Sequence, residues 1–218
     1  MTVRPDEPLF FLPNRVWRCY LGGQLLDRMQ GVRPERDGSE PEDWIASTTP
    51  AGNPKPKPRE GISRVLLSDG TLGPWLDELL ARRSGDFLGS TGSSGVRVLC
   101  KFLDSAIRLP VQVHPDRPFA RKHYNSPVGK TETWFLLDTR APAPGAEAPY
   151  LYMGFKPGVD ATAFGEALKR EDVPTAAAML HRIPAKAGEG WFIPGGVPHA
   201  IGPGCLILEV QEPSDLVI

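Results

Sequence analysis

Turn-forming residues limit what most of this chain can fold into. Its 218 residues include 23 glycines and 24 prolines. Proline removes a backbone donor and glycine enters tight turns freely, so this content favours short strands over long helices. Short apolar runs between the turns predict strands at 96–103, 109–114, 131–138, 150–155, 190–194, 199–201 and 205–211. Such a series indicates a mainly β fold of the sandwich or barrel type.

Helical patterns form a smaller second layer. Apolar residues recur on one face between Gly70 and Arg83, with Pro74 tolerated in the first turn. Further helices are predicted over 116–125, with Asp116 as N-cap and Pro118 early in it, and over 162–170 and 174–180. The stretch 85–95 (GDFLGSTGSSG) is predicted to be a flexible loop.

Residues 1–60 are rich in proline and charge and predict an irregular arm. Trp17, Trp44 and Ile45 are its candidate anchors on the core. No linker or internal repeat divides the chain, so residues 1–218 are predicted to form one domain.

Composition and charge limit the kinds of binding partner that this chain is expected to have. With a formal net charge of -1, 40% hydrophobic and 23% charged residues, the chain is typical of a soluble globular protein. No basic surplus favours a nucleic acid or an anionic membrane, and no apolar run predicts a secretory signal or a membrane span. The cysteines, Cys19, Cys100 and Cys205, are odd in number and lack a CxxC pair, which favours reduced thiols in the cytoplasm. No pattern specifies an oligomeric state.

Four residues suggest a metal site. Gln112 and His114 lie two apart on a predicted strand, so their side chains leave the same face. Glu132 lies on a later strand, and His199 follows a Gly-Gly-Val-Pro turn. Two imidazoles, a carboxylate and an amide suit Zn, Fe, Mn, Co or Ni at an open site, and the lack of a thiolate argues against a closed structural zinc site. From spacing alone, the two histidines could equally be ordinary polar residues at strand ends.

Several short sequence motifs resemble those of a known protein family. The runs VQVHPD, GKTETWFLLD and GEGWFIPGGVPHAIGPGCLILEVQEPSD closely resemble the class I phosphomannose isomerases, and EDWIASTTPAG is similar to a stretch near that family's N-terminus. The resemblance runs from about Asn14 to the last residue. It implies a cupin-type β-sandwich, a zinc ion bound by Gln112, His114, Glu132 and His199, and interconversion of mannose 6-phosphate and fructose 6-phosphate.

The resemblance also implies three pocket residues. Lys101 and Lys130 match lysines that line the family's substrate pocket, and Glu209 matches a glutamate near the sugar. A buried carboxylate with a raised pKa could move a proton between C1 and C2. Two alternatives stay open: Lys130 as a solvated turn lysine, and Glu209 as a carboxylate paired with an arginine. His123 and His181 are interpreted as helix-surface residues, and Glu212 and Asp215 as surface or turn residues.

The chain departs from the family in two places. Family members continue past the Ser-Asp pair with a few apolar residues, a catalytic arginine and a second cupin-like domain, whereas this sequence stops at Ile218. A fragment and a one-domain relative are both open. The opening NRVWRCYLGGQLLDRMQG differs from the family's compact Trp-Gly-Gly opening and suggests a divergent subgroup with another sugar.

Three functions follow as hypotheses. The first is a metal-dependent aldose–ketose isomerase acting on mannose 6-phosphate, fructose 6-phosphate or a related sugar. The second is a sugar-binding cupin without catalysis. The third, an Fe(II) cupin oxygenase, is disfavoured by the glutamine ligand and the GKTE motif.

Overall fold

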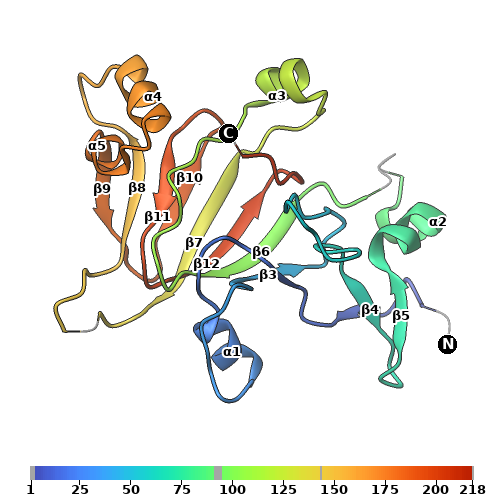
Figure 1. The fold of residues 1–218 in the computed structure, drawn as a ribbon. Helices are drawn as coiled ribbons and strands as arrows, with labels where there is room; N and C mark the ends of the chain where they lie inside the picture. Colours follow the sequence, from blue (N-terminus) through green and yellow to red (C-terminus); the bar gives the residue numbers. More distant parts are fainter. Residues whose placement is uncertain (1–2, 91–94, 143, 218) are drawn as a thin grey trace.

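Two antiparallel sheets face each other in the centre of the computed structural model, which describes residues 3–90, 95–142 and 144–217 (Figure 1). The larger sheet has the order β10-β7-β12-β6-β3-β2, and the smaller has the order β11-β8-β9. The strands of the larger sheet are β2 (Arg15–Val16), β3 (Glu42–Ile45), β6 (Leu99–Asp104), β7 (Glu132–Thr139), β10 (Gly190–Ile193) and β12 (Cys205–Gln211). Those of the smaller are β8 (Tyr150–Phe155), β9 (Leu180–Pro184) and β11 (His199–Ile201).

The main core fills the space between these sheets. Trp134 and Ile207 come from the larger sheet, Leu151 and Ile201 come from the smaller, and all four belong to one buried cluster. Along β7 the residues alternate between buried and exposed up to Leu136, as the period of a strand requires. The predicted β-sandwich is therefore confirmed, and the five predicted strands from 131–138 onward are present within one or two residues.

A third sheet forms a lobe on the right of Figure 1. It contains β1 (Phe10–Phe11), β4 (Arg64–Leu66) and β5 (Leu72–Trp75), and α2 (Leu76–Leu88) packs against it. The helix predicted from Gly70 is wrong up to Trp75: β5 occupies Leu72–Trp75 and the helix begins only at Leu76, because Pro74 disfavours helical geometry in the residue before it. The predicted loop 85–95 is also wrong at its start, where α2 continues, and its residues 91–94 lie outside the described part of the chain.

The N-terminal sixty residues are more regular than predicted. Here β2 and β3 extend the larger sheet, and α1 (Gln24–Gln30) packs on the outer side of the sandwich. Trp44 is fully buried, as expected of an anchor, and Ile45 is partly buried. Trp17 is 40% exposed, so its assignment as an anchor is wrong.

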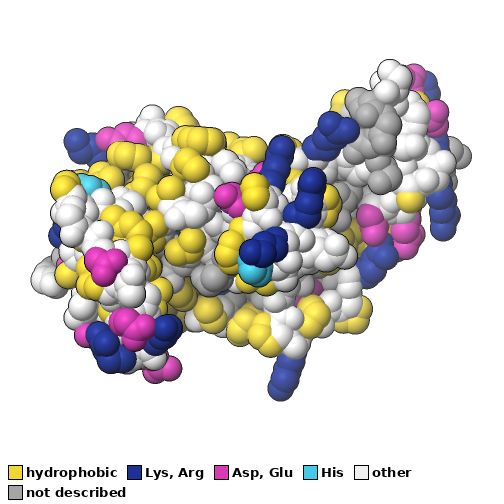
Figure 2. Space-filling view, turned by 90° about the horizontal axis from the view of Figure 1, so that it is seen from above, with side chains coloured by type: hydrophobic (Ala, Val, Ile, Leu, Met, Phe, Trp, Pro, Cys, Tyr) yellow, Lys and Arg dark blue, Asp and Glu magenta, His cyan; other side chains and the backbone are white. Residues whose placement is uncertain are grey.

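The three remaining helices are α3 (Arg117–Tyr124), α4 (Ala161–Lys169) and α5 (Val173–Ala178), and all three were predicted. Asp116 caps α3 by accepting a hydrogen bond from the Phe119 amide at 2.8 Å. His123 is exposed on α3, over which lysine and arginine side chains gather near the centre of Figure 2. His181 is exposed but lies on β9, which was not predicted, rather than on a helix.

The segment 109–114 is not a regular strand, contrary to prediction. It pairs with β11 through a single bridge, in which Gln112 and His199 exchange two backbone hydrogen bonds of 3.0 Å. Pro110 lacks the amide that a continuous ladder needs. The consequence is that Gln112 and His199 are held side by side even though the strand is absent.

Two predictions about the whole chain can be compared with the described residues. All three cysteines are free, as expected. Among the described residues, no helix has both the length and the apolar character needed to cross a membrane.

Candidate metal centre and adjoining cavity

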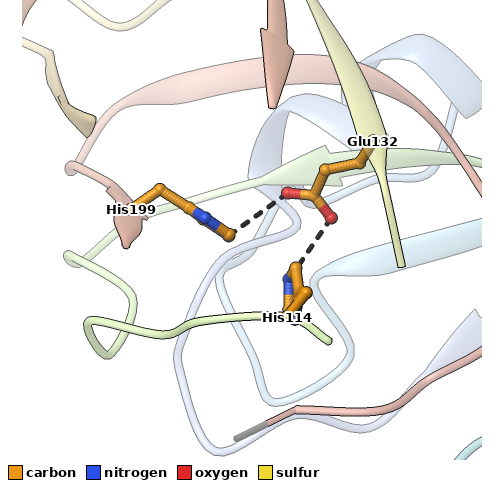
Figure 3. Close-up of side chains that lie close together, drawn as sticks. All are labelled: His114, Glu132 and His199. Atoms are coloured by element: carbon orange, nitrogen blue, oxygen red, sulfur yellow. Dashed lines mark ion pairs between the residues drawn. The ribbon is translucent and has the colours of Figure 1, made fainter. Parts of the chain in front are cut away.

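Three potential metal ligands meet where the two sheets approach each other. Glu132 begins β7, His199 begins β11, and His114 comes from the segment that pairs with β11. All three side chains are almost fully buried. Figure 3 shows the two imidazoles pointing at the two oxygens of the Glu132 carboxylate.

Two glycines bring these segments together. A Cβ at Gly129 would lie 2.6 Å from the Pro115 carbonyl oxygen, and one at Gly195 would lie 2.7 Å from the Asp116 Cα. The turn after His114 is therefore packed directly against the segments that precede Glu132 and His199. The Gly-Lys-Thr-Glu and Pro-Gly-Gly sequences thus have a steric reason, since no larger residue allows this approach.

The spacing of the ligand atoms suits a small cation. His114 Nε2 lies 3.3 Å from Glu132 Oε2, and His199 Nε2 lies 3.3 Å from Glu132 Oε1. Ligands about 2.1 Å from a tetrahedral ion are separated by about 3.4 Å. One donor atom from each of the three residues lies within 4.8 Å of the others, so the group could hold a metal ion.

Hydrogen bonding also fits a metal. His199 Nδ1 lies 2.8 Å from the Val197 carbonyl oxygen, which fixes the proton on Nδ1 and leaves the Nε2 lone pair free. That Nε2 atom and Glu132 Oε2 are buried without a hydrogen-bond partner among the described residues. The Lys130 ammonium lies 2.8 Å from His114 Nε2 and 3.5 Å from Glu132 Oε2, so a bound ion would take the place of this ammonium at the two ligands. The residues present therefore fit a divalent ion.

Burial also favours the ligand forms of these side chains. Burial and the nearby Lys130 ammonium lower the pKa of His114 to about 3. Burial lowers the pKa of His199 as well. For Glu132, burial is outweighed by Lys130 and the two imidazoles, so its pKa falls well below the usual range. At neutral pH the group is two neutral imidazoles and a carboxylate, which are the forms that bind metal.

A cavity of about 520 Å³ adjoins this group. Gln112, Lys130, Lys101 and Glu209 are among the residues that line it, and Lys130 Nζ also lies 2.8 Å from His114 Nε2. The structure therefore brings the three catalytic candidates to one cavity beside His114, Glu132 and His199. Gln112 lines this cavity next to His199, and its role as a fourth ligand stays a prediction.

The two lysines and Glu209 are all buried. Lys130 is only 4% exposed, so the alternative of a solvated turn lysine is wrong. Glu209 Oε1 lies 3.4 Å from Lys101 Nζ, so its partner is a lysine and not an arginine. Burial and the Glu132 charge raise the pKa of Glu209 to about 8 against the opposing effect of Lys101. The expected raised pKa of a buried carboxylate is thus present.

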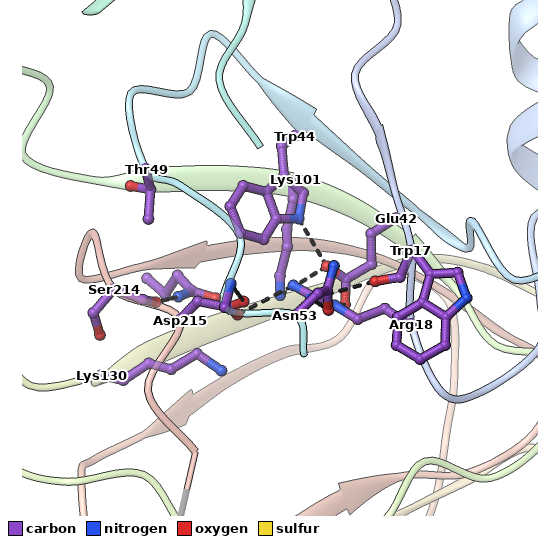
Figure 4. Close-up of polar contacts among 12 residues, drawn as sticks. Trp17, Arg18, Glu42, Trp44, Thr49, Asn53, Lys101, Lys130, Ser214 and Asp215 are labelled. Carbon is purple, nitrogen blue, oxygen red and sulfur yellow. Dashed lines mark hydrogen bonds and ion pairs between the residues drawn. The ribbon is translucent and has the colours of Figure 1, made fainter. Parts of the chain in front are cut away.

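Sequence reasoning missed a second cluster on the same cavity, drawn in Figure 4. Glu42 receives hydrogen bonds from the Tyr20 hydroxyl at 2.6 Å and the Trp44 indole at 2.7 Å. It also pairs with Arg18 Nε at 3.0 Å and with Lys101 Nζ at 3.4 Å. Glu42 stands two residues before the buried Trp44 on β3, and an acidic residue in phase with a core residue was the available signal.

Asp215 is the other missed residue. It was interpreted as a surface or turn residue, but its side chain is 11% exposed and lines the cavity. Asp215 Oδ1 pairs with Arg18 Nη2 at 3.1 Å, and Asp215 Oδ2 accepts from the Gly52 amide at 2.8 Å. The two partners lie far away in the sequence, which is why local pattern could not reveal this role.

Known proteins of one kind resemble this chain. A mannose-6-phosphate isomerase of Streptococcus mutans is 33% identical over 217 residues, covering 96% of this chain and 58% of that protein. A mannose-6-phosphate isomerase of Bacillus subtilis is 31% identical over 209 residues, covering 96% of this chain and 59% of its own length. No family model matches the chain.

Solved structures agree in fold. The crystal structure of a mannose 6-phosphate isomerase from Bacillus subtilis superposes with a TM-score of 0.74 at 26% identity, covering 97% of this chain and 60% of that one. A zinc-bound mannose 6-phosphate isomerase has the same fold with a TM-score of 0.63 at 16% identity, covering 96% of this chain and 69% of that one. The chain spans about three fifths of the length of the curated relatives it matches.

Proposed function

We propose, from the premise that this chain is a relative of the mannose-6-phosphate isomerases in sequence and in fold, that it interconverts an aldose phosphate and a ketose phosphate with a bound divalent metal. Mannose 6-phosphate and fructose 6-phosphate are the proposed pair. The observation that carries this proposal is the buried group of His114, Glu132 and His199 at the edge of a cavity that contains Glu209 and Lys101.

Zinc is the proposed metal. His114, Glu132 and His199 would hold it, and the Gln112 amide oxygen would be the fourth ligand, because Gln112 lines the cavity next to His199. A bound divalent ion in such a site polarises the carbonyl and hydroxyl oxygens of an open-chain sugar. The donor set, with no thiolate, leaves room for that exchange of oxygen ligands.

Proton transfer is assigned to the chain's own residues. A base removes the proton from C2 of the aldose while the C1 oxygen gains a proton, which gives a cis-enediol. The base returns its proton to C1 while the C2 hydroxyl loses its own, which gives the ketose. Glu209 is the better candidate, since among the described residues its Oε1 atom accepts no hydrogen bond and only faces Lys101 Nζ at 3.4 Å; Lys130 is the alternative base.

Lys101 supports this assignment. Burial alone would lower the pKa of Lys101, but Glu209 and Glu42 raise it, so its ammonium stays charged between two carboxylates. A charge at this place orients Glu209 and can stabilise an enediolate oxygen. The cavity volume of about 520 Å³ also lies in the ordinary range for sites that bind small molecules.

Two further features belong to the proposal. The chain is proposed to act as a single domain over residues 1–218, with a sugar phosphate as its partner. A cytoplasmic location accords with three cysteines that form no disulfide.

The test is turnover by the purified, zinc-loaded protein. We expect fructose 6-phosphate to form from mannose 6-phosphate, with the rate lost on chelation and restored by zinc. Saturable sugar binding without turnover would contradict the isomerase and leave the sugar-binding cupin. Oxygen consumption that depends on added Fe(II) would instead favour the oxygenase.

A further inference from the structure

Arg18 lies in the opening stretch of the chain, to which no role has yet been assigned. Its side chain is only 12% exposed, and Arg18 lines the same cavity. Three of its nitrogens have separate partners: Nε meets Glu42 at 3.0 Å, Nη2 meets Asp215 at 3.1 Å, and Nη1 donates to the Asn53 amide oxygen at 3.0 Å. One guanidinium therefore joins its own segment to three others.

The segment that carries Asp215 runs across the loop that carries Lys130. Ser214 Oγ donates to the Gly129 carbonyl oxygen at 2.6 Å. The Glu212 amide donates to the Thr131 carbonyl oxygen at 3.0 Å, and Glu212 Oε2 accepts from the Thr131 amide at 3.1 Å. We name residues 212–215 the strap. The strap is bonded to the residues on both sides of Lys130, and its last residue, Asp215, pairs with Arg18.

Arg18 is also connected to Lys101 and Glu209, which line the same cavity. Its partner Glu42 contacts Lys101, and Lys101 in turn contacts Glu209. Figure 4 shows Lys101 beside Glu42 and Arg18, with Ser214, Asp215 and Lys130 on one side of the network and Trp17 at the other end. The chain of contacts thus runs from Lys130 through the strap and Arg18 to Lys101 and Glu209.

We propose that Arg18 is a positioning residue that fixes the distance between Lys130 on one side and Lys101 and Glu209 on the other. This inference rests on the proposed isomerase function. An arginine suits the task because its planar group holds several acceptors in fixed directions, which a lysine cannot do. Because two carboxylates already engage Arg18, it acts by holding the strap and Glu42 in place and not by binding the sugar phosphate.

A matched control exists elsewhere in the chain. Arg140 is also partly buried between two acids, pairing with Asp37 at 2.7 Å and with Asp104 at 2.6 Å. It joins Asp37, in the loop after α1, to Asp104 on β6, and it is not among the residues that line the cavity. Replacement of either arginine removes a comparable two-acid contact, but only Arg18 connects to the strap.

The experiment compares Arg18→Gln, Arg18→Lys, Asp215→Asn and Arg140→Gln in the zinc-loaded protein. For Arg18→Gln we expect kcat to fall at least about tenfold with KM changed less and zinc content unchanged, since small displacements of reacting groups are costly. Arg18→Lys and Asp215→Asn should show the same split to a smaller degree, and they serve if Arg18→Gln does not fold. Arg140→Gln should keep kcat within about twofold of the wild-type value, even if its melting temperature falls as far as that of Arg18→Gln.

Hydrogen exchange separates this proposal from the proposed function. The Glu212 and Gly52 amides should exchange faster in the Arg18 and Asp215 variants than in Arg140→Gln, whether or not the protein turns over sugar. No turnover by the wild type, together with this exchange pattern, would reject the isomerase and keep the positioning role for the strap. Unchanged exchange of both amides, or an equal loss of kcat in Arg140→Gln, would overturn the inference about Arg18.

Discussion

Two buried polar clusters border one cavity, and they differ in how well their atoms are satisfied. In the metal group, Glu132 Oε2 and His199 Nε2 have no hydrogen-bond partner among the described residues. In the second cluster, each Glu42 oxygen has two partners: Tyr20 and Arg18 on Oε1, Trp44 and Lys101 on Oε2. Both carboxylates are almost fully buried, so exposure does not explain the difference.

The difference separates a binding site from its support. A buried polar atom without a partner is costly, and it persists where function requires it. The metal group therefore keeps the His199 Nε2 lone pair free for a cation, while the Glu42 cluster uses both carboxylate oxygens to hold side chains in place. Loss of a residue from the first should remove a ligand, and loss from the second should reduce stability.

The largest effect is expected from removing a ligand. His114→Ala should lower the affinity for zinc more than about a hundredfold, because even residues that only orient a ligand are worth ten- to a hundredfold. Elemental analysis of the purified variant and a zinc titration measure this. His123→Ala is the control, since that histidine is exposed on α3 and should leave zinc content unchanged. Equal zinc content in the wild type and in His114→Ala would contradict the assignment of the metal site.

An effect on the fold, and not on metal binding, is expected from Glu42→Gln. The change leaves Lys101 and Arg18 with one buried countercharge fewer, and breaking a buried ion pair costs about 3–5 kcal/mol. Urea denaturation measures the free energy of unfolding, and zinc content should stay unchanged. Glu166→Gln, which removes an exposed pair with Lys169, should cost less than about 1 kcal/mol. Equal costs for the two variants would show that the Glu42 cluster gives no special support.

The two clusters also differ in how much of them the sequence reveals. His114, Glu132 and His199 stand in short motifs that resemble those of a known family, so the sequence led to them, although spacing alone left ordinary polar residues equally open. Arg18 and Asp215 meet only after the sheets assemble, 197 residues apart, and no local period predicts such a contact. The same reason explains the fold: the five strands from 131–138 onward were predicted, whereas the two-residue strand β2 depends on pairing with β3.

Glu209 lies between the two clusters, and the smallest of the expected effects concerns its protonation. In the metal-free protein its pKa is raised to about 8 by burial and Glu132, from an ordinary value of 4.5. Between these values the folded state holds a proton that the unfolded state has lost, so stability should fall as pH rises from 4.5 to 8. In Glu209→Gln this part of the decline should vanish, measured as melting temperature against pH. A wild-type curve parallel to that of the variant would mean that Glu209 is ionised throughout, held by Lys101 as firmly as Glu42 is held by its own partners.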